Sequence, residues 1–273
     1  MTLSINDLRR DFGKISAMSP LILHLPHAST LIPQTDRGDF LLGDRELADE
    51  SRRLVDAHTD ALFGAEFWPG AVLAAKVSRL VVDVERFADD AKEPCARVGM
   101  GATYVRTSDG RPLRALSAAR RAALLENYYA PHHATADRLA AERLAVAGRC
   151  LVLDAHSYPV DPLPTEVVAR RPEIGLGTDA VHTCPELRDL LAGFFRARGY
   201  EVAVDAPFTG AFVPNACFGR EARCQGIMVE VRRDLYMDES TGGRHAGFGR
   251  VRADLVALQP MLAAFAARDV WPT

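Results

Sequence analysis

The sequence contains few cysteines, and their placement excludes common structural uses of this residue. Its 273 residues include five cysteines, an odd number with no CxxC pair. They are scattered along the chain, at Cys95, Cys150, Cys184, Cys217 and Cys224. This pattern does not form a disulfide framework. The first ten residues also lack the basic-then-apolar layout of a signal peptide, so we expect a cytoplasmic protein with reduced thiols.

Long apolar runs and a surplus of charge of one sign are absent as well. No apolar stretch approaches the length needed to cross a bilayer. The 33 basic and 36 acidic residues give a formal net charge of −3, and no basic stripe with interleaved aromatic residues is present. We therefore expect neither a membrane nor a nucleic acid as a partner.

What the sequence does contain is the composition of an ordinary globular protein. Hydrophobic residues make up 48% and charged residues 25%, which is enough apolar material for a sizeable core. The length suits one large α/β domain, and a single domain over residues 1–273 is the simplest division.

Short apolar runs alternate with longer stretches of helical composition. The runs predict buried strands at 20–25, 71–77 continuing to 80–84, 150–154, 201–204 and 226–231. Helices are predicted at 116–146 with a break near Pro131, at 187–198, and at 251–268 with an interruption at Pro260. This alternation predicts a three-layer α/β/α fold with a mostly parallel sheet, in which chemistry takes place beyond the carboxyl ends of the strands.

Two histidines follow predicted strands and are candidate metal ligands. His27 comes after the first strand, and His156 follows the strand at 150–154. Between them, residues 54–60 supply carboxylates, including Asp56, on an expected helix. Two imidazoles and one carboxylate, with water as fourth ligand, are typical of catalytic zinc. Each histidine could instead be structural, and Asp154 could either orient a ligand or cap a turn.

Glu230 is a carboxylate inside an apolar run, between Val229 and Val231. A buried carboxylate is costly unless it is paired, so Glu230 is a candidate general base with a raised pKa. The alternative is an ion pair with Arg232 or Arg233.

Arginines and a histidine pair are candidates for contact with a substrate. Arg79 and Arg86 flank the predicted strand at 80–84, and Arg106 follows a short apolar stretch. Arginine binds carboxylates through two parallel donors. Adjacent side chains on a helix diverge by about 100°, so His132 and His133 are not expected to share an ion, although one could reach the cleft.

Taken together, these segments resemble the N-formylglutamate amidohydrolase family, within the zinc-carboxypeptidase-like hydrolases. The resemblance spans most of the chain in consistent order. It is carried by residues 26–29 (PHAS), 55–63 (VDAHTDALF), 78–86 (SRLVVDVER), 129–133 (YAPHH), 154–157 (DAHS), 176–179 (LGTD) and 229–239 (VEVRRDLYMDE).

The resemblance implies a mixed, mostly parallel sheet and a zinc ion held by a histidine, a carboxylate and the histidine of the Asp-x-His-Ser segment. On this chain these ligands are His27, Asp56 and His156. Glu230 is similar to the family's general base. The predicted substrate-binding set consists of Arg79, Arg86, Arg106 and His133.

The resemblance also implies the reaction. A small N-acyl amino acid, N-formyl-L-glutamate in the namesake reaction, is hydrolysed to the amino acid and formate. Alternatives are a carboxypeptidase or deacylase for another acyl amino acid, and a catalytically silent ligand-binding relative. Two or three arginines converging on the pocket would favour a dicarboxylate, and one would favour a single carboxylate. The ligand set also admits divalent ions other than zinc.

Two positions depart from the family pattern. Glu85 stands where the family has a neutral amide, and it is expected either to repel a dicarboxylate or to pair with Arg86. Around Asp56 the chain reads Val-Asp-Ala instead of Thr-Asp-Trp, which leaves Asp49 and Glu50 as alternative carboxylate ligands.

Overall fold

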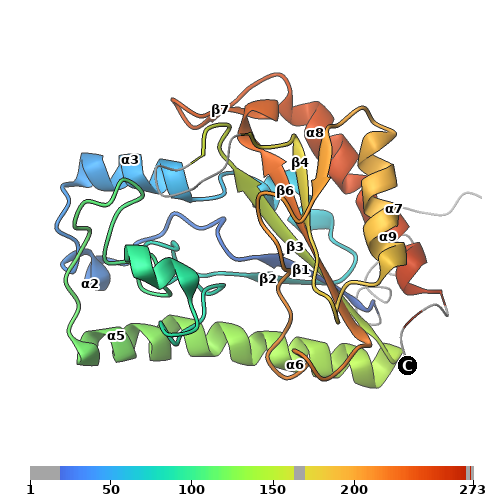
Figure 1. Cartoon of the computed structure of the whole chain (residues 1–273), viewed down its shortest axis with the longest axis horizontal. Coiled ribbons are helices and arrows are strands. Elements are labelled where there is room, and N and C mark those ends of the chain that lie inside the picture. The colour runs from blue at the N-terminus through green and yellow to red at the C-terminus, as the bar shows by residue number, and fades with distance from the viewer. Residues whose placement is uncertain (1–18, 163–169, 269–270, 272–273) are drawn as a thin grey trace, which may run out of the picture.

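A six-stranded mixed sheet forms the centre of the computed structural model, which describes residues 19–162, 170–268 and 271 (Figure 1). The strand order is β2-β1-β3-β6-β4-β5. Pairing is parallel except between β4 and β6. The strands are β1 (Leu21–Leu25), β2 (Ala71–Ala74), β3 (Cys150–Tyr158), β4 (Ile174–Gly177), β5 (Val202–Val204) and β6 (Cys224–Arg232).

Helices cover both faces of the sheet, which confirms the predicted three-layer α/β/α class. In Figure 1, α5 and α6 run along the lower edge, and α7 to α9 lie on the opposite side of the sheet. The helices are α2 (Gln34–Arg37), α3 (Asp44–Leu54), α4 (Thr59–Leu62), α5 (Ala118–Leu124), α6 (Ala130–Ala147), α7 (Pro185–Arg196), α8 (Phe248–Val256) and α9 (Leu258–Ala266). Shorter elements are β7 (Met237–Asp238), β8 (Gly243–Arg244), the 3₁₀ turns η1 (Ala65–Phe67), η2 (Pro94–Val98) and η4 (Arg233–Leu235), and the π turn η3 (Leu125–Tyr129).

Alternating side chains of each strand enter two different cores, as the pleat of a strand requires. In β1, Leu21 and Leu23 pack in the core that includes residues of α7, α8 and α9, whereas Ile22 packs against α6. Strands β3 and β6 alternate in the same way. The same alternation turns four polar side chains to the α6 side of the sheet, where Ile22 also lies. These residues are His24, Asp154, His156 and Glu230.

The stretch predicted as a strand at 80–84 is a buried turn, so that prediction was wrong. Its apolar side chains fill a third core together with α3 and the loops around Tyr104. The side chain of Arg114 supplies hydrogen bonds that a neighbouring strand would otherwise provide. Its Nη2 donates to the Val81 carbonyl at 2.8 Å, and its Nε donates to the Tyr104 carbonyl at 2.6 Å. Arg79 and Arg86 therefore lie on irregular backbone.

Several other boundaries differ from the predictions for local reasons. Pro131 lies in the first turn of α6, after the π turn, and does not break the helix. The last helical region divides at Ala257, and Pro260 lies in the first turn of α9, where its missing N–H costs no helical bond. Strand β3 continues to Tyr158, and β4 was not predicted at all.

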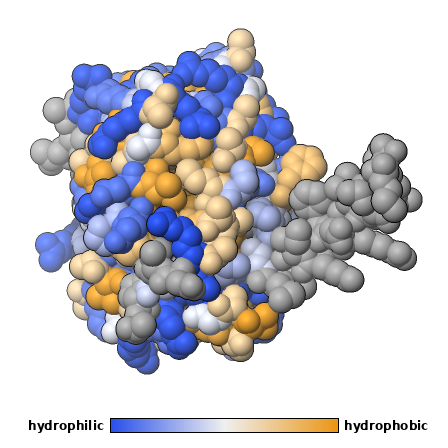
Figure 2. Space-filling model, turned by 90° about the vertical axis from the view of Figure 1, so that its right-hand side faces the viewer, coloured by the Kyte–Doolittle hydropathy of each residue, from blue (hydrophilic) through white to orange (hydrophobic). Residues whose placement is uncertain are grey.

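The described part of the chain contains no helix of the length and apolarity that a bilayer crossing requires. All five cysteines are free thiols. The amino-terminal segment interpreted above lies outside the described residues. In Figure 2, the face bearing α7 and α9 mixes hydrophilic and hydrophobic residues, with apolar residues gathered across its middle.

Close packing of the backbone at Gly70 gives a prediction about stability. A methyl group on Gly70 would lie 2.9 Å from the carbonyl carbon of Leu21 and overlap the backbone of β1. We expect Gly70→Ala to lower the free energy of unfolding by about 1–3 kcal/mol, because a backbone cannot move aside as a side chain can. Urea denaturation measures this change.

Gly193 provides the matched control. It is exposed in the middle of α7, with open space around the added methyl group. Gly193→Ala should raise the free energy of unfolding by roughly 0.5–1 kcal/mol. Equal effects of the two substitutions would contradict the packing argument.

Candidate metal centre

The three predicted metal ligands converge at one end of the sheet. His156 Nδ1 lies 3.1 Å from Asp56 Oδ2, and His27 Nδ1 lies 3.5 Å from the same oxygen. Each residue offers one potential ligand atom, and these three atoms lie within 4.8 Å of one another. All three side chains are buried. Such a set of donors could hold a divalent cation.

Asp56 reaches this position from a loop and not from the expected helix. Helix α3 ends at Leu54, and the Asp56 N–H donates to the carbonyl of His27 at 3.0 Å. The Thr59 hydroxyl donates to the Asp56 carbonyl at 2.9 Å, and Arg233 Nη2 lies 3.2 Å from Asp56 Oδ1. These contacts fix the carboxylate between the two imidazoles.

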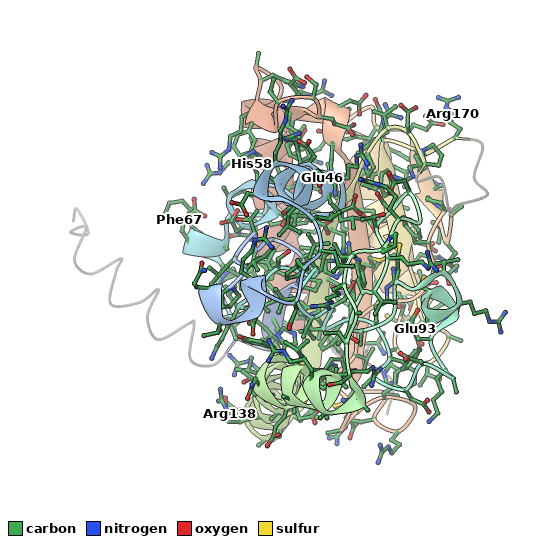
Figure 3. The ribbon with its side chains drawn as sticks, turned by 90° about the vertical axis from the view of Figure 1, so that its left-hand side faces the viewer. Glu46, His58, Phe67, Glu93, Arg138 and Arg170 are labelled. Atoms are coloured by element: carbon green, nitrogen blue, oxygen red, sulfur yellow. The ribbon has the colours of Figure 1, made fainter. Side chains whose placement is uncertain are left out.

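The other two carboxylates considered as ligands point elsewhere. Asp49 pairs with Arg52 at 3.0 Å. Glu50 is buried against Ser108, whose N–H and hydroxyl both donate to its carboxylate. His58 is also remote: it begins α4 near the upper edge of Figure 3, and its Nε2 lies 2.9 Å from the carbonyl of Gly242.

Each imidazole is held by a carboxylate through its other nitrogen. His27 Nε2–H donates to Asp83 Oδ1 at 2.9 Å, and His156 Nε2 lies 3.0 Å from Asp154 Oδ1. When each ring is neutral, this arrangement leaves the lone pair of Nδ1 facing Asp56. His27 Nδ1 is buried and has no hydrogen-bond partner among the described residues. An orphaned imidazole nitrogen beside a carboxylate and a second imidazole fits a cation.

Without a cation, the charges of the site favour a proton on both nitrogens of these imidazoles. Burial raises the pKa of Asp83, but the charges of His27 and Arg79 outweigh it and hold that pKa well below its usual value. Burial likewise opposes a positive charge on His156, yet Glu85 and Asp154 raise its pKa well above the ordinary value. A proton and a metal ion would therefore compete for His156 Nδ1.

Two histidines with no assigned role continue this network behind Asp154. His24 Nδ1 lies 2.8 Å from Asp154 Oδ1, and His24 Nε2 lies 3.0 Å from His132 Nε2. Burial, together with the neighbouring histidines, lowers the pKa of His132 to about 2, which keeps this ring neutral. The pairing of His24 with Asp154 across β1 and β3 explains why these side chains meet.

Glu230 faces the same space from the neighbouring strand, where its Cα pairs with that of His156. Its Oε2 is buried and has no hydrogen-bond partner. Burial, reinforced by the charges of Asp56 and Glu85 and partly offset by His156, raises its pKa to about 7. Neither predicted ion pair forms, because Arg232 pairs with Asp234 and Arg233 with Asp56.

The cavity in front of these groups has a volume of about 630 Å³. Besides the three ligands and Glu230, its wall includes Arg79, Arg86 and His133 from the predicted substrate-binding set. Further arginines on the wall are Arg53, Arg171 and Arg233, and aromatic residues are Phe87, Tyr104, Tyr129, Tyr158, Phe208, Phe212 and Phe218. The cavity thus combines several guanidinium groups with apolar surface.

The predicted substrate-binding residues differ in how they are held. Arg79 is engaged by Asp83 Oδ2 at 2.7 Å and by the hydroxyl of Tyr104 at 3.0 Å. Arg86 has a buried Nε with no hydrogen-bond partner, and its nearest carboxylates, Asp83 and Glu93, are both 3.7 Å away. It is therefore better placed than Arg79 to receive an anion.

Arg106, from the predicted substrate-binding set, is not among the described residues that line the cavity. It is exposed and donates to the carbonyl of Gly110 at 2.8 Å.

His132 and His133 diverge as expected: His132 turns to His24, whereas His133 lines the cavity. His133 Nε2–H donates to the Val84 carbonyl at 2.8 Å, and its Nδ1 accepts from Asn215 Nδ2 at 3.1 Å. Arg138, further along α6, projects outward at the lower edge of Figure 3.

Glu85 does not make the contact with Arg86 that was one of the two expectations from the sequence. Its Oε1 lies 3.0 Å from His156 Nε2, and its Oε2 lies 3.6 Å from His27 Nε2. No ion pair joins it to Arg86 among the described residues. The carboxylate belongs to the imidazole cluster.

Comparison with known proteins gives a consistent picture. The model of the N-formylglutamate amidohydrolase family matches residues 19–237. The N-formylglutamate deformylase of Pseudomonas putida is 28% identical over 228 residues, which cover 81% of this chain and 83% of that protein.

Two solved structures share the fold. The crystal structure of N-formylglutamate amidohydrolase from Ralstonia eutropha JMP134 superposes with a TM-score of 0.79 at 27% identity, covering 92% of this chain and 95% of that one. Gene product Atu2144 of Agrobacterium tumefaciens has a TM-score of 0.63 at 21% identity, covering 91% and 89% of the two chains.

The raised pKa of Glu230 predicts that this residue destabilises the metal-free protein at high pH. The folded state holds the proton more tightly than the unfolded state, so stability falls as pH rises from about 4.5 to about 7. Glu230→Gln should therefore raise the free energy of unfolding by on the order of 3 kcal/mol at pH 8. At pH 5 the gain should fall below about 1 kcal/mol.

Urea denaturation of the metal-free proteins at the two pH values measures this difference. Glu126→Gln, which removes an exposed carboxylate on the π turn, is the control and should change stability little at either pH. A gain that does not depend on pH would show that Glu230 is not held protonated by its surroundings.

Proposed function

Since this chain belongs to the N-formylglutamate amidohydrolase family, we propose that it hydrolyses N-formyl-L-glutamate to L-glutamate and formate in a metal-dependent reaction. The observation that carries the proposal is the convergence of His27, Asp56 and His156 around an orphaned imidazole nitrogen, next to Glu230. The names of the P. putida and R. eutropha relatives supply the substrate.

We assign the metal to the space between the two Nδ1 atoms and Asp56. A zinc ion there would polarise the formyl carbonyl and lower the pKa of a water molecule towards neutrality. Asp83 and Asp154 would keep both imidazoles in the tautomer that offers Nδ1. Other divalent ions would suit the same ligands, with zinc favoured by two imidazoles.

Glu230 is the proposed general base. In its ionised form it would take a proton from the attacking water as the oxygen bonds to the formyl carbon. The same carboxyl group would then give the proton to the departing nitrogen as the C–N bond breaks. A pKa near 7 suits both directions of transfer, because the group is neither too weak a base nor too weak an acid.

The arginines of the cavity support a substrate with more than one carboxylate. Arg86 is proposed to bind one carboxylate, because its buried Nε has no hydrogen-bond partner among the described residues. Arg53 and Arg171 also line the cavity, so the arginines exceed the single one expected for a monocarboxylate. Arg79 is proposed to act from its position between Asp83 and Tyr104, and His133 to shape the adjoining wall.

Purified protein loaded with zinc should release formate from N-formyl-L-glutamate, and chelation should abolish this activity. His156→Ala should lose both tight zinc binding and turnover, because one ligand of three is removed. Glu230→Gln should retain zinc and lower kcat by about 10²–10⁴-fold, because only proton transfer is lost. Formate release and metal content together separate the two roles.

Three outcomes would contradict the proposal. Full activity of His156→Ala would remove the metal site from the mechanism. Release of amine from other N-acyl amino acids, but not from N-formylglutamate, would favour the deacylase alternative. A zinc-loaded protein that turns over neither class would be a catalytically silent relative.

Arg86→Ala should raise KM for N-formyl-L-glutamate roughly 10- to 100-fold, with a smaller effect on kcat, because a charge-assisted contact with substrate is lost. Arg106→Ala is the matched control. It removes the same charge outside the cavity and should leave KM unchanged. Steady-state kinetics measure KM for both variants. Equal effects on KM would exclude Arg86 as the group that binds the substrate carboxylate.

A further inference from the structure

A second group of potential ligand atoms lies beside the proposed metal centre. His24, Glu85 and Asp154 each offer one atom, and these atoms lie within 4.8 Å of one another. His24 and Asp154 are fully buried, and the side chain of Glu85 is 21% exposed at the cavity. None of the three belongs to the ligand set of the first site.

The two carboxylates of this group share one hydrogen-bond donor, His156 Nε2. Asp154 Oδ1 and Glu85 Oε1 each lie 3.0 Å from His156 Nε2, which carries one hydrogen. Among the described residues, no arginine or lysine comes within the 4.0 Å of an ion pair with Glu85. His27 Nε2, 3.6 Å away, already donates to Asp83. Two carboxylates so close together repel unless a positive charge joins them.

His24 is able to supply a ligand atom to such a charge. Its two nitrogens face Asp154 Oδ1 at 2.8 Å and His132 Nε2 at 3.0 Å. If His24 Nε2–H donates to the neutral His132, the lone pair of His24 Nδ1 faces the carboxylate. For ligands about 2.1 Å from one ion, neighbouring ligand atoms lie ~3 Å apart in octahedral and ~3.4 Å apart in tetrahedral coordination, so the 2.8 Å separation is nearer the octahedral value.

Neighbouring groups fix these ligands in place. The Phe212 N–H donates to Asp154 Oδ2 at 2.9 Å, which sets the plane of the carboxylate. The ring of Phe212 stacks on His24 with centroids 3.8 Å apart. A site in which the ligands are already oriented loses little entropy when an ion binds.

We propose that His24, Asp154 and Glu85 form a second divalent-cation site, on the Nε2 side of His156. The site goes beyond the proposed function, which requires only the first cation. One imidazole and two carboxylates suit Zn²⁺ or Mn²⁺. His132 is a positioning residue that holds His24 in the ligating tautomer. A cation here also neutralises Glu85, whose charge would otherwise oppose an anionic substrate.

Metal stoichiometry tests the second site without reference to activity. Metal-free protein is titrated with Zn²⁺ by calorimetry, and bound metal is counted by elemental analysis after desalting. The wild-type chain should bind two equivalents, and His27→Ala and Glu85→Gln one each. Glu126→Gln, which removes a surface carboxylate instead, should bind two. His132→Gln should weaken the second binding event by about 10–100-fold.

Anomalous scattering at the zinc edge then locates the ions without any variant. Two peaks, one between His24 and Glu85, are expected. A single equivalent that is lost in His27→Ala but kept in Glu85→Gln would overturn the second site and leave the proposed function standing. A single equivalent lost in Glu85→Gln but kept in His27→Ala would do the reverse.

Discussion

The parallel pairing of β3 with β6 is the interaction on which the rest of the site depends. It extends over nine residue pairs and sets His156 opposite Glu230. Because side chains alternate along both strands, the two residues point to the same face, while their apolar neighbours enter the core on the other. A register shift of one residue in either strand would turn the functional group of that strand into that core. The hydrophobic packing of the opposite face therefore fixes the distance between a metal ligand and a base.

Burial of charge is the second constraint, and it follows from the first. The carboxylates that meet at this end of the sheet lie away from bulk water and need partners. Asp83 joins His27 to Arg79, and Asp56 joins His156 to Arg233. Glu230 Oε2 has no hydrogen-bond partner among the described residues, and burial of this carboxyl group raises its pKa. Glu85 also has no arginine or lysine partner among the described residues, and it lies beside the imidazoles instead.

Sequence reasoning predicted the layers, the main strands and the three residues that converge on the candidate metal centre. It succeeded where a signal was local, as for Glu230 within an apolar run. It failed at 80–84, because the partner of that run is the side chain of Arg114 and not another strand. It could not foresee that His24 meets Asp154, or that Glu85 turns from Arg86 to His156. Those contacts depend on strand order and on loop paths, which a single sequence does not specify.

The side chain of Arg114 has a consequence for how this chain can change over time. It ties the loop before Asp83 to the loop after Tyr104, and the Asp83 N–H is held in turn by the carbonyl of Ala102. The stretch from Arg86 to Met100, which contributes Arg86 and Phe87 to the cavity, therefore leaves and returns at anchored points. Insertions, deletions and exchanges within it can accumulate while Asp83 stays on His27. Residues that contact the substrate can therefore change while the metal ligands stay the same.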